Sequence, residues 1–118
     1  MNSEPTAPVT VRFTPEFKRN LRSLSKKYRH IRSDVEPVVV QIQSGDFVGD
    51  RIPATGYTLF KVRVKNSDAQ KGQRSGYRLI YYVNSPAEVI LVTIYSKLEQ
   101  SDVSANEIRR ILAQSAKQ

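Results

Sequence analysis

The chain of 118 residues contains no cysteine and only one histidine, His30. Without cysteine it cannot form disulfides, thiolate nucleophiles or zinc–thiolate sites. One histidine cannot supply a histidine pair to a metal ion, so we expect neither a metal nor another cofactor. No apolar run approaches the roughly 18 residues that a membrane-spanning helix needs. The sequence therefore predicts neither thiol chemistry nor a membrane-spanning helix.

The first eight residues are polar and read M-N-S-E-P-T-A-P. They lack the apolar segment of a secretory signal peptide, so we expect a cytoplasmic protein. Their composition predicts a flexible tail over residues 1–8. The length of the chain favours a single domain, which we place at residues 9–118.

Positive charge is in excess, with 19 lysines and arginines against 11 acidic residues and a formal net charge of +8. Such an excess favours nucleic acid or an acidic protein as partner over a small neutral ligand. A hydrophobic content of 39% is enough for one small core. A high net charge can also serve solubility alone, so the arrangement of the charges decides between these explanations.

The basic residues are most ordered at residues 59–65, where apolar and basic side chains alternate in the segment L-F-K-V-R-V-K. A period of two predicts a strand with one core face and one face that carries Lys61, Arg63 and Lys65. We call these three residues the cationic row. Like charges two residues apart on a strand repel each other and cost stability. We infer that a polyanion binds the cationic row.

Turn signals divide the chain into elements in the order β-α-α-β-β-β-α. We expect strands at 9–13, 59–65, 76–83 and 89–95, helices at about 14–28, 33–44 and 104–115, and a loop at 46–58. Predicted helix N-caps are Thr14, Ser33-Asp34 and Ser104. The three consecutive strands predict an antiparallel meander in an α+β domain, with the helices packed on one face.

Three segments are the most characteristic: F-K-V-R-V at 60–64, S-G-Y-R-L-I-Y-Y at 75–82 and V-T-I-Y-S-K at 92–97. Together with the element order they resemble the RelE/ParE toxin superfamily, and within it the RelE- and HigB-like toxins of type II toxin–antitoxin modules. The resemblance covers about residues 9–115. It implies a RelE-like fold, ribosome-dependent cleavage of mRNA in the decoding site, and a cognate antitoxin that silences the toxin.

The resemblance also implies catalytic roles for Lys61, Arg63 and Arg78, which match basic positions of the family. RNA cleavage can use the 2′-OH of the substrate as nucleophile, so the enzyme must move protons and stabilise the charge on phosphorus. Arg63 or Arg78 could hold the scissile phosphate through two hydrogen bonds. Neighbouring arginines would favour a neutral fraction of Lys61, which could act as general base.

Where RelE has an arginine and a tyrosine, this chain has Leu98 and Ser104. Lys97 lies in the same turn and could supply the missing cation, so we include it among the catalytic candidates. Tyr82 or Tyr95 could stack on a base or donate a proton, although Tyr95 fits a core position better.

Further RNA contacts are predicted at Lys65, Lys71, Arg74 and Tyr82. Lys71 and Arg74 belong to the polar loop at 66–75, where they could equally form a plain solvated hairpin tip. We expect Tyr77 and Tyr81 in the core or at an interface, since strands favour tyrosine.

Two other functions stay open at this point. A ParE-like toxin would bind DNA gyrase and would need no nuclease site, and the basic residues at 61, 63 and 78 argue against it. A non-catalytic RNA-binding module would need a stacking pair of exposed aromatic residues on consecutive strands, which the sequence does not offer.

Overall fold

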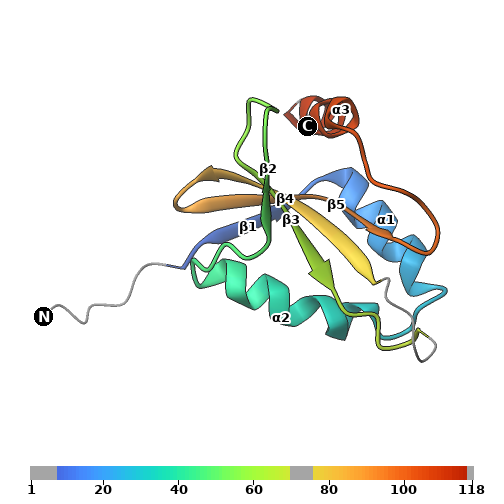
Figure 1. Cartoon of the computed structure of the whole chain (residues 1–118). Coiled ribbons are helices and arrows are strands. Elements are labelled where there is room, and N and C mark those ends of the chain that lie inside the picture. The colour runs from blue at the N-terminus through green and yellow to red at the C-terminus, as the bar shows by residue number, and fades with distance from the viewer. Residues whose placement is uncertain (1–7, 70–75, 117–118) are drawn as a thin grey trace, which may run out of the picture.

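The computed structural model describes residues 8–69 and 76–116, so the predicted tail lies outside the described residues except for Pro8. The elements are β1 (Thr10–Phe13), α1 (Pro15–Ser25), α2 (Ile31–Gln43), β2 (Asp50–Ile52), β3 (Leu59–Val64), β4 (Tyr77–Ser85), β5 (Glu88–Ser96) and α3 (Ala105–Ala116). They form a small α+β domain with a five-stranded mixed sheet and three helices (Figure 1). None of the helices in this part of the chain is long and apolar enough to cross a membrane.

The sheet has the strand order β1-β5-β4-β3-β2. The three strands expected at 59–65, 76–83 and 89–95 are β3, β4 and β5, and each pairs antiparallel with the next. β1 pairs parallel with β5, so the sheet as a whole is mixed. The region predicted as a loop at 46–58 contains β2, which pairs with β3. A strand of three residues, D-R-I, is too short to show the alternation on which a sequence-based prediction depends.

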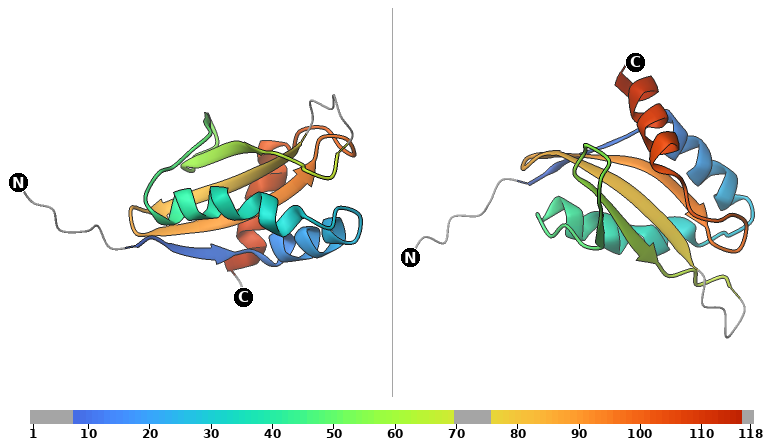
Figure 2. Two further views of the ribbon diagram at one scale, coloured as in Figure 1. Left: turned by 90° about the horizontal axis from the view of Figure 1, so that it is seen from below. Right: turned by 45° about the horizontal axis from the view of Figure 1, so that its top comes forward.

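The helices cover both faces of the sheet, and the prediction that they pack on one face is wrong. α1 and α2 pack on one face, and α3 packs on the other, where it contacts Leu59 and Ile80. In Figure 1 α2 lies below the sheet and α3 above it, and Figure 2 shows the same layers from two further directions. The apolar stripe of α3 (Ile108, Ile111 and Leu112) is buried in the smaller core, but the pattern of such a stripe does not say which face of a sheet the helix covers.

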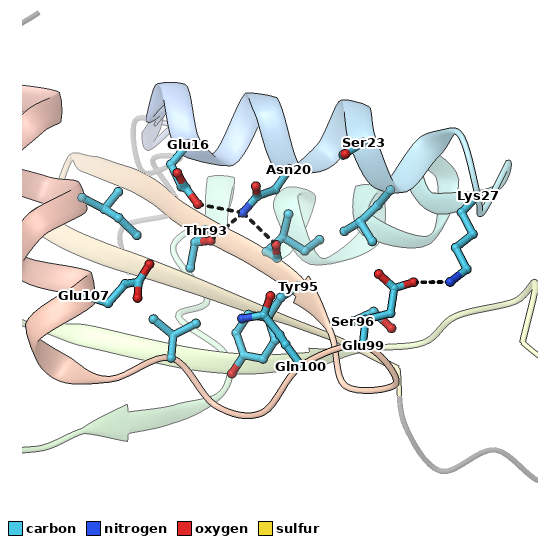
Figure 3. A pocket seen from close by; sticks show the side chains of 14 residues that line it. Glu16, Asn20, Ser23, Lys27, Thr93, Tyr95, Ser96, Glu99, Gln100 and Glu107 are labelled. Carbon is cyan, nitrogen blue, oxygen red and sulfur yellow. Dashed lines mark hydrogen bonds and ion pairs between the residues drawn. The ribbon is translucent and has the colours of Figure 1, made fainter.

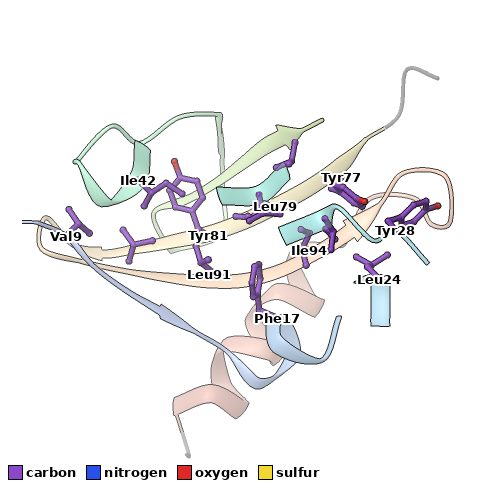
Figure 4. Close-up of a cluster of buried hydrophobic side chains, with 14 residues drawn as sticks. Val9, Phe17, Leu24, Tyr28, Ile42, Tyr77, Leu79, Tyr81, Leu91 and Ile94 are labelled. Carbon is purple, nitrogen blue, oxygen red and sulfur yellow. The ribbon is translucent and has the colours of Figure 1, made fainter. Parts of the chain in front are cut away.

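Strand alternation divides the buried side chains between these two faces. Leu79 and Tyr81 of β4 belong to the larger core with α1 and α2, as Figure 4 shows, whereas Ile80 belongs to the smaller core under α3. Tyr77 and Tyr81 are fully buried, as expected. Both faces of β4 and β5 are therefore covered over much of their length.

Two predicted helix starts are confirmed and one is wrong. The Thr14 hydroxyl accepts from the backbone N–H of Phe17, and that of Ser104 accepts from the N–H of Glu107. α2 begins earlier than predicted, at Ile31, with His30 at the N-cap. Asp34, which was predicted to cap α2, instead accepts from the backbone N–H and the hydroxyl of Ser67. It thereby ties α2 to the segment that follows β3.

Thr14 is the residue whose loss should most clearly test how α1 is fixed to the sheet. Its fully buried hydroxyl accepts from Phe17 and also donates to the carbonyl of Val92 on β5, at 2.7 Å. We expect Thr14→Ala to lower the free energy of unfolding by about 2 kcal/mol, because it removes a cap and leaves a buried carbonyl without this donor. Urea denaturation measures the change. Thr14→Ser should restore most of the stability, and the exposed Thr10→Ala should change it by less than about 0.5 kcal/mol.

Candidate functional site

The register between β3 and β4 brings the predicted arginines together. Arg63 lies directly opposite Arg78, and Lys61 lies opposite Ile80 two residues along the same face. Side chains directly opposite each other on an antiparallel pair have Cβ atoms about 5 Å apart. None of the ion pairs among the described residues involves Arg63 or Arg78. Two arginines thus lie directly opposite each other on neighbouring strands, and neither forms an ion pair with a carboxylate among the described residues.

Along the strands, the side chains on this face change from buried and apolar to exposed and basic. Leu59 and Ile80 are buried under α3, whereas Lys61 and Arg78 are half-buried and Arg63 is exposed. The apolar cover therefore ends where the cations begin. We call Lys61, Arg63 and Arg78, together with Lys97 just after β5, the cationic face.

Two carboxylates lie on the same face of the sheet as these cations. One belongs to Asp50, directly opposite Lys61 in the β2–β3 ladder, and the other to Asp102, to which the sequence did not point. Asp102 Oδ1 accepts from Lys97 Nζ at 3.1 Å and from the Tyr95 hydroxyl at 3.2 Å, and it lies 3.6 Å from Lys61 Nζ. The Lys97 hydrogen bond, followed by the charge of Lys61, lowers the pKa of Asp102. The carboxylate is therefore ionised near neutral pH. Lys61 thus has an anion beside it as well as arginines. Its predicted role as general base depended on the arginines alone.

Tyr95 joins the cationic face to the core. It lies opposite Arg78 in the β4–β5 ladder and its side chain is only 3% exposed. Burial first, and the nearby Asp102 carboxylate second, raise the pKa of Tyr95 to about 12. Its hydroxyl therefore stays protonated over the physiological range and can donate a hydrogen bond. The core position predicted for Tyr95 is confirmed, and the same residue presents a donor to the site.

The other predicted RNA contacts lie elsewhere. Tyr82 is on the same face as Arg78 but four residues further along β4, roughly 13 Å away, and its ring packs edge-on against Tyr57. Lys65 is exposed and lies one residue beyond β3, where the strand no longer determines its direction. Lys71 and Arg74 lie outside the described residues.

A polar cavity of about 270 Å³ lies beside the cationic face, between α1, β5, α3 and the segment at 97–104. Figure 3 shows three carboxylates around it, those of Glu16, Glu99 and Glu107. Lys27 donates to Glu99 at 2.7 Å, and this hydrogen bond lowers the pKa of Glu99. The ring of Tyr95 forms part of the wall. An acidic lining suits a cation or a neutral polar group and repels phosphate, so the anion-binding surface is the cationic face.

The described residues contain no group of three or more histidine or acidic side chains that could hold a metal ion. The chain matches no protein-family model.

Gly76 determines how closely β3, β4 and the end of β5 approach one another. A Cβ atom at this position would lie 2.3 Å from the carbonyl oxygen of Val64, and the Gly76 carbonyl accepts from the backbone N–H of Lys97. Any larger residue must push β3 away from β4. The glycine therefore holds Arg78 and Lys97 in their present positions.

We expect Gly76→Ala to lower the free energy of unfolding by more than about 2 kcal/mol, because backbone atoms cannot move aside cheaply. It should also shift the amide resonances of Arg78 and Lys97. Gly56→Ala is the matched control, because Gly56 has a φ of +85° but no atom within 4 Å of its would-be Cβ. The control should lose about 1 kcal/mol to backbone strain alone and leave both resonances unchanged. Unshifted resonances in Gly76→Ala would contradict this role.

Proposed function

We propose that the chain is the toxin of a type II toxin–antitoxin module and a ribosome-dependent endoribonuclease that cleaves mRNA in the decoding site. The observation that carries the proposal is the pairing of Arg63 with Arg78, without a carboxylate partner, beside Lys61 and Lys97. Like charges placed this close cost stability unless an anion binds between them. A phosphodiester is the anion that two guanidinium groups bind with the best geometry.

The proposed reaction rearranges bonds within the RNA itself. The 2′-OH attacks the adjacent phosphorus and gives its proton to water, the bond to the 5′-oxygen breaks, and that oxygen takes a proton from water. The products are a 2′,3′-cyclic phosphate and a free 5′-OH. Arg63 and Arg78 stabilise the charge that builds up on the phosphorane oxygens. Tyr95, which stays protonated, would donate a hydrogen bond to the same centre once its hydroxyl no longer donates to Asp102.

Lys61 enters this proposal as a phosphate-binding cation. Asp102 lies 3.6 Å from its ammonium group, so the surroundings are not purely cationic. Lys97, half-buried and 3.1 Å from the same carboxylate, has a similar position. Both lysines lie next to Tyr95 and add positive charge to the surface that faces the substrate.

A cognate antitoxin is part of the proposal. With a net charge of +8 and an open cationic face, the chain would attract an acidic segment over a distance and bind it at short range. Such a segment would compete directly with RNA. The ribosome and its mRNA are the other partners, which places the protein in the cytoplasm.

Removal of one arginine should separate catalysis from stability. We expect Arg78→Ala to slow cleavage of ribosome-bound mRNA by at least about 100-fold, because the phosphorane loses a charged donor. Lys61→Ala and Arg63→Ala should likewise relieve growth inhibition on expression while leaving the melting temperature nearly unchanged. The control is Arg22→Ala on the exposed side of α1, which removes the same charge far from the site. If all four variants cleaved as fast as the wild-type chain, the active site would lie elsewhere.

Free RNA should be a poor substrate. The site is rich in cations and poor in groups that transfer protons near neutral pH, and general acid–base catalysis is typically worth about 10²–10⁴-fold. The remaining acceleration must come from holding the 2′-OH in line with the scissile bond, which a ribosome can do for mRNA. We expect clear cleavage of mRNA on translating ribosomes and negligible cleavage of the naked transcript, measured by primer extension. Efficient metal-free cleavage of naked RNA would contradict ribosome dependence, and gyrase inhibition without cleavage would favour the ParE-like function.

A further inference from the structure

Three polar groups from different parts of the chain surround a single oxygen of Asp102, two of them through hydrogen bonds and Lys61 through an ion pair. They are Lys61 Nζ on β3, the Tyr95 hydroxyl on β5 and Lys97 Nζ just beyond β5, at 3.6, 3.2 and 3.1 Å from Oδ1. Three donors around one point, two of them charged, make a binding place for an anionic oxygen. We call these three residues the cradle.

The residues of the cradle are less exposed than the Asp102 carboxylate that they surround. The side chains of Lys61 and Lys97 are 33% and 27% exposed, whereas that of Asp102 is 57% exposed. Lys61 and Tyr95 lie on paired strands, and Lys97, the first residue after β5, is fixed by the hydrogen bond from its backbone N–H to the Gly76 carbonyl. Asp102 lies further along the same segment between β5 and α3, which has no regular structure. Solvent-exposed ion pairs are weak. Asp102 can therefore leave while the cradle keeps its shape.

We propose that the cradle is a binding site for a phosphate oxygen of RNA and that Asp102 occupies it as an internal competitor until RNA displaces the carboxylate. The inference rests on the proposed function in one respect only, which is that RNA is the ligand of this face. The carboxylate imitates the phosphate because both present a negatively charged oxygen to the same donors.

The position of the cradle supports a phosphodiester as its ligand. Tyr95 lies directly opposite Arg78, which in turn lies directly opposite Arg63. The cradle and the two arginines therefore form one continuous surface for a chain of phosphates. When RNA replaces Asp102, one anion takes the place of another and the lysines are never left without a partner. In the free protein the contact of Asp102 with the cradle lowers the affinity for RNA, because this contact must be broken before RNA can bind.

The test is equilibrium binding of a fluorescein-labelled, single-stranded 2′-O-methyl RNA, which cannot be cleaved by 2′-OH attack. Fluorescence anisotropy compares the wild-type chain with Asp102→Asn, which keeps the shape of the side chain and removes its charge. We expect binding about threefold to fivefold tighter, as for the release of an exposed ion pair. Glu36→Gln is the matched control, because it changes the net charge equally from an exposed position on α2. Its effect should stay below about twofold at physiological salt.

A double-mutant comparison makes the test specific to the cradle. In a Lys97→Ala background the gain from Asp102→Asn should shrink, because the competitor then blocks a weaker site. Asp102→Ala should bind the RNA as tightly as Asp102→Asn. Equal binding would show that the new amide of Asn does not itself contact the RNA. Thermal unfolding of each variant confirms that the fold is intact. Unchanged or weaker binding by Asp102→Asn would overturn the proposal, and so would a gain equal to that of Glu36→Gln.

Titration with inorganic phosphate separates this inference from the nuclease proposal. In ¹⁵N-labelled protein, phosphate should shift the amide resonances of Lys97 and Asp102, and it should do so at lower concentration in Asp102→Asn. Both effects together with a failure to cleave ribosome-bound mRNA would leave the cradle as an anion site and reject the nuclease. The absence of both the phosphate shifts and the gain in RNA affinity would reject the cradle, whatever the outcome of the cleavage assay.

Discussion

The pairing of β3 with β4 is the constraint on which the rest of the structure depends. Because side chains alternate along a strand, one register decides both what is buried and what is presented. Val64 opposite Tyr77 and Val62 opposite Leu79 lie toward α1 and α2, while Arg63 opposite Arg78 lies on the other face. A shift of β3 by one residue would turn Arg63 toward the larger core. Gly76 helps to hold this register, since only a residue without a side chain fits beside the Val64 carbonyl.

The second face of the sheet is shared between a core and a charged surface. α3 covers one end of it and buries Leu59 and Ile80, and at the other end Arg63 is exposed. The strands are continuous across this boundary, so the packing beneath α3 holds the backbone of the charged part in place. Rigid strands are a better support for a phosphate-binding surface than a loop, because they set the spacing between cations.

Positive charge acts both over the whole chain and within the cationic face. The whole chain carries a charge of +8, which attracts anions over a distance. Close to the surface, the carboxylate of Asp102 lies near two lysines and the Tyr95 hydroxyl. Tyr95 also lines the neighbouring cavity that contains Glu16, Glu99 and Glu107. One aromatic residue thus belongs both to the wall of an acidic cavity and to the surroundings of the cationic face.

Much of the fold could be predicted from local signals, because alternation, helical spacing and capping residues act over a few positions. The strands β3, β4 and β5, the cap at Thr14, the buried Tyr77 and Tyr81, and the face shared by Lys61 and Arg63 all followed from such patterns. Local patterns could not decide between the two faces of a sheet, so the position of α3 was predicted wrongly. They also missed β2, whose three residues are a strand only because β3 lies beside them.

The candidate site divides in the same way. The sequence by itself determined that a row of cations lies on one face of a strand, since that depends on the period of the side chains alone. Only the tertiary structure decided that Arg78 lies opposite Arg63, that Tyr82 packs on Tyr57 away from them, and that Asp102 reaches Lys61 across 41 positions of sequence. The physical reason is that contacts between distant residues depend on register and on the path of connecting segments. No local preference for helix, strand or turn contains that information.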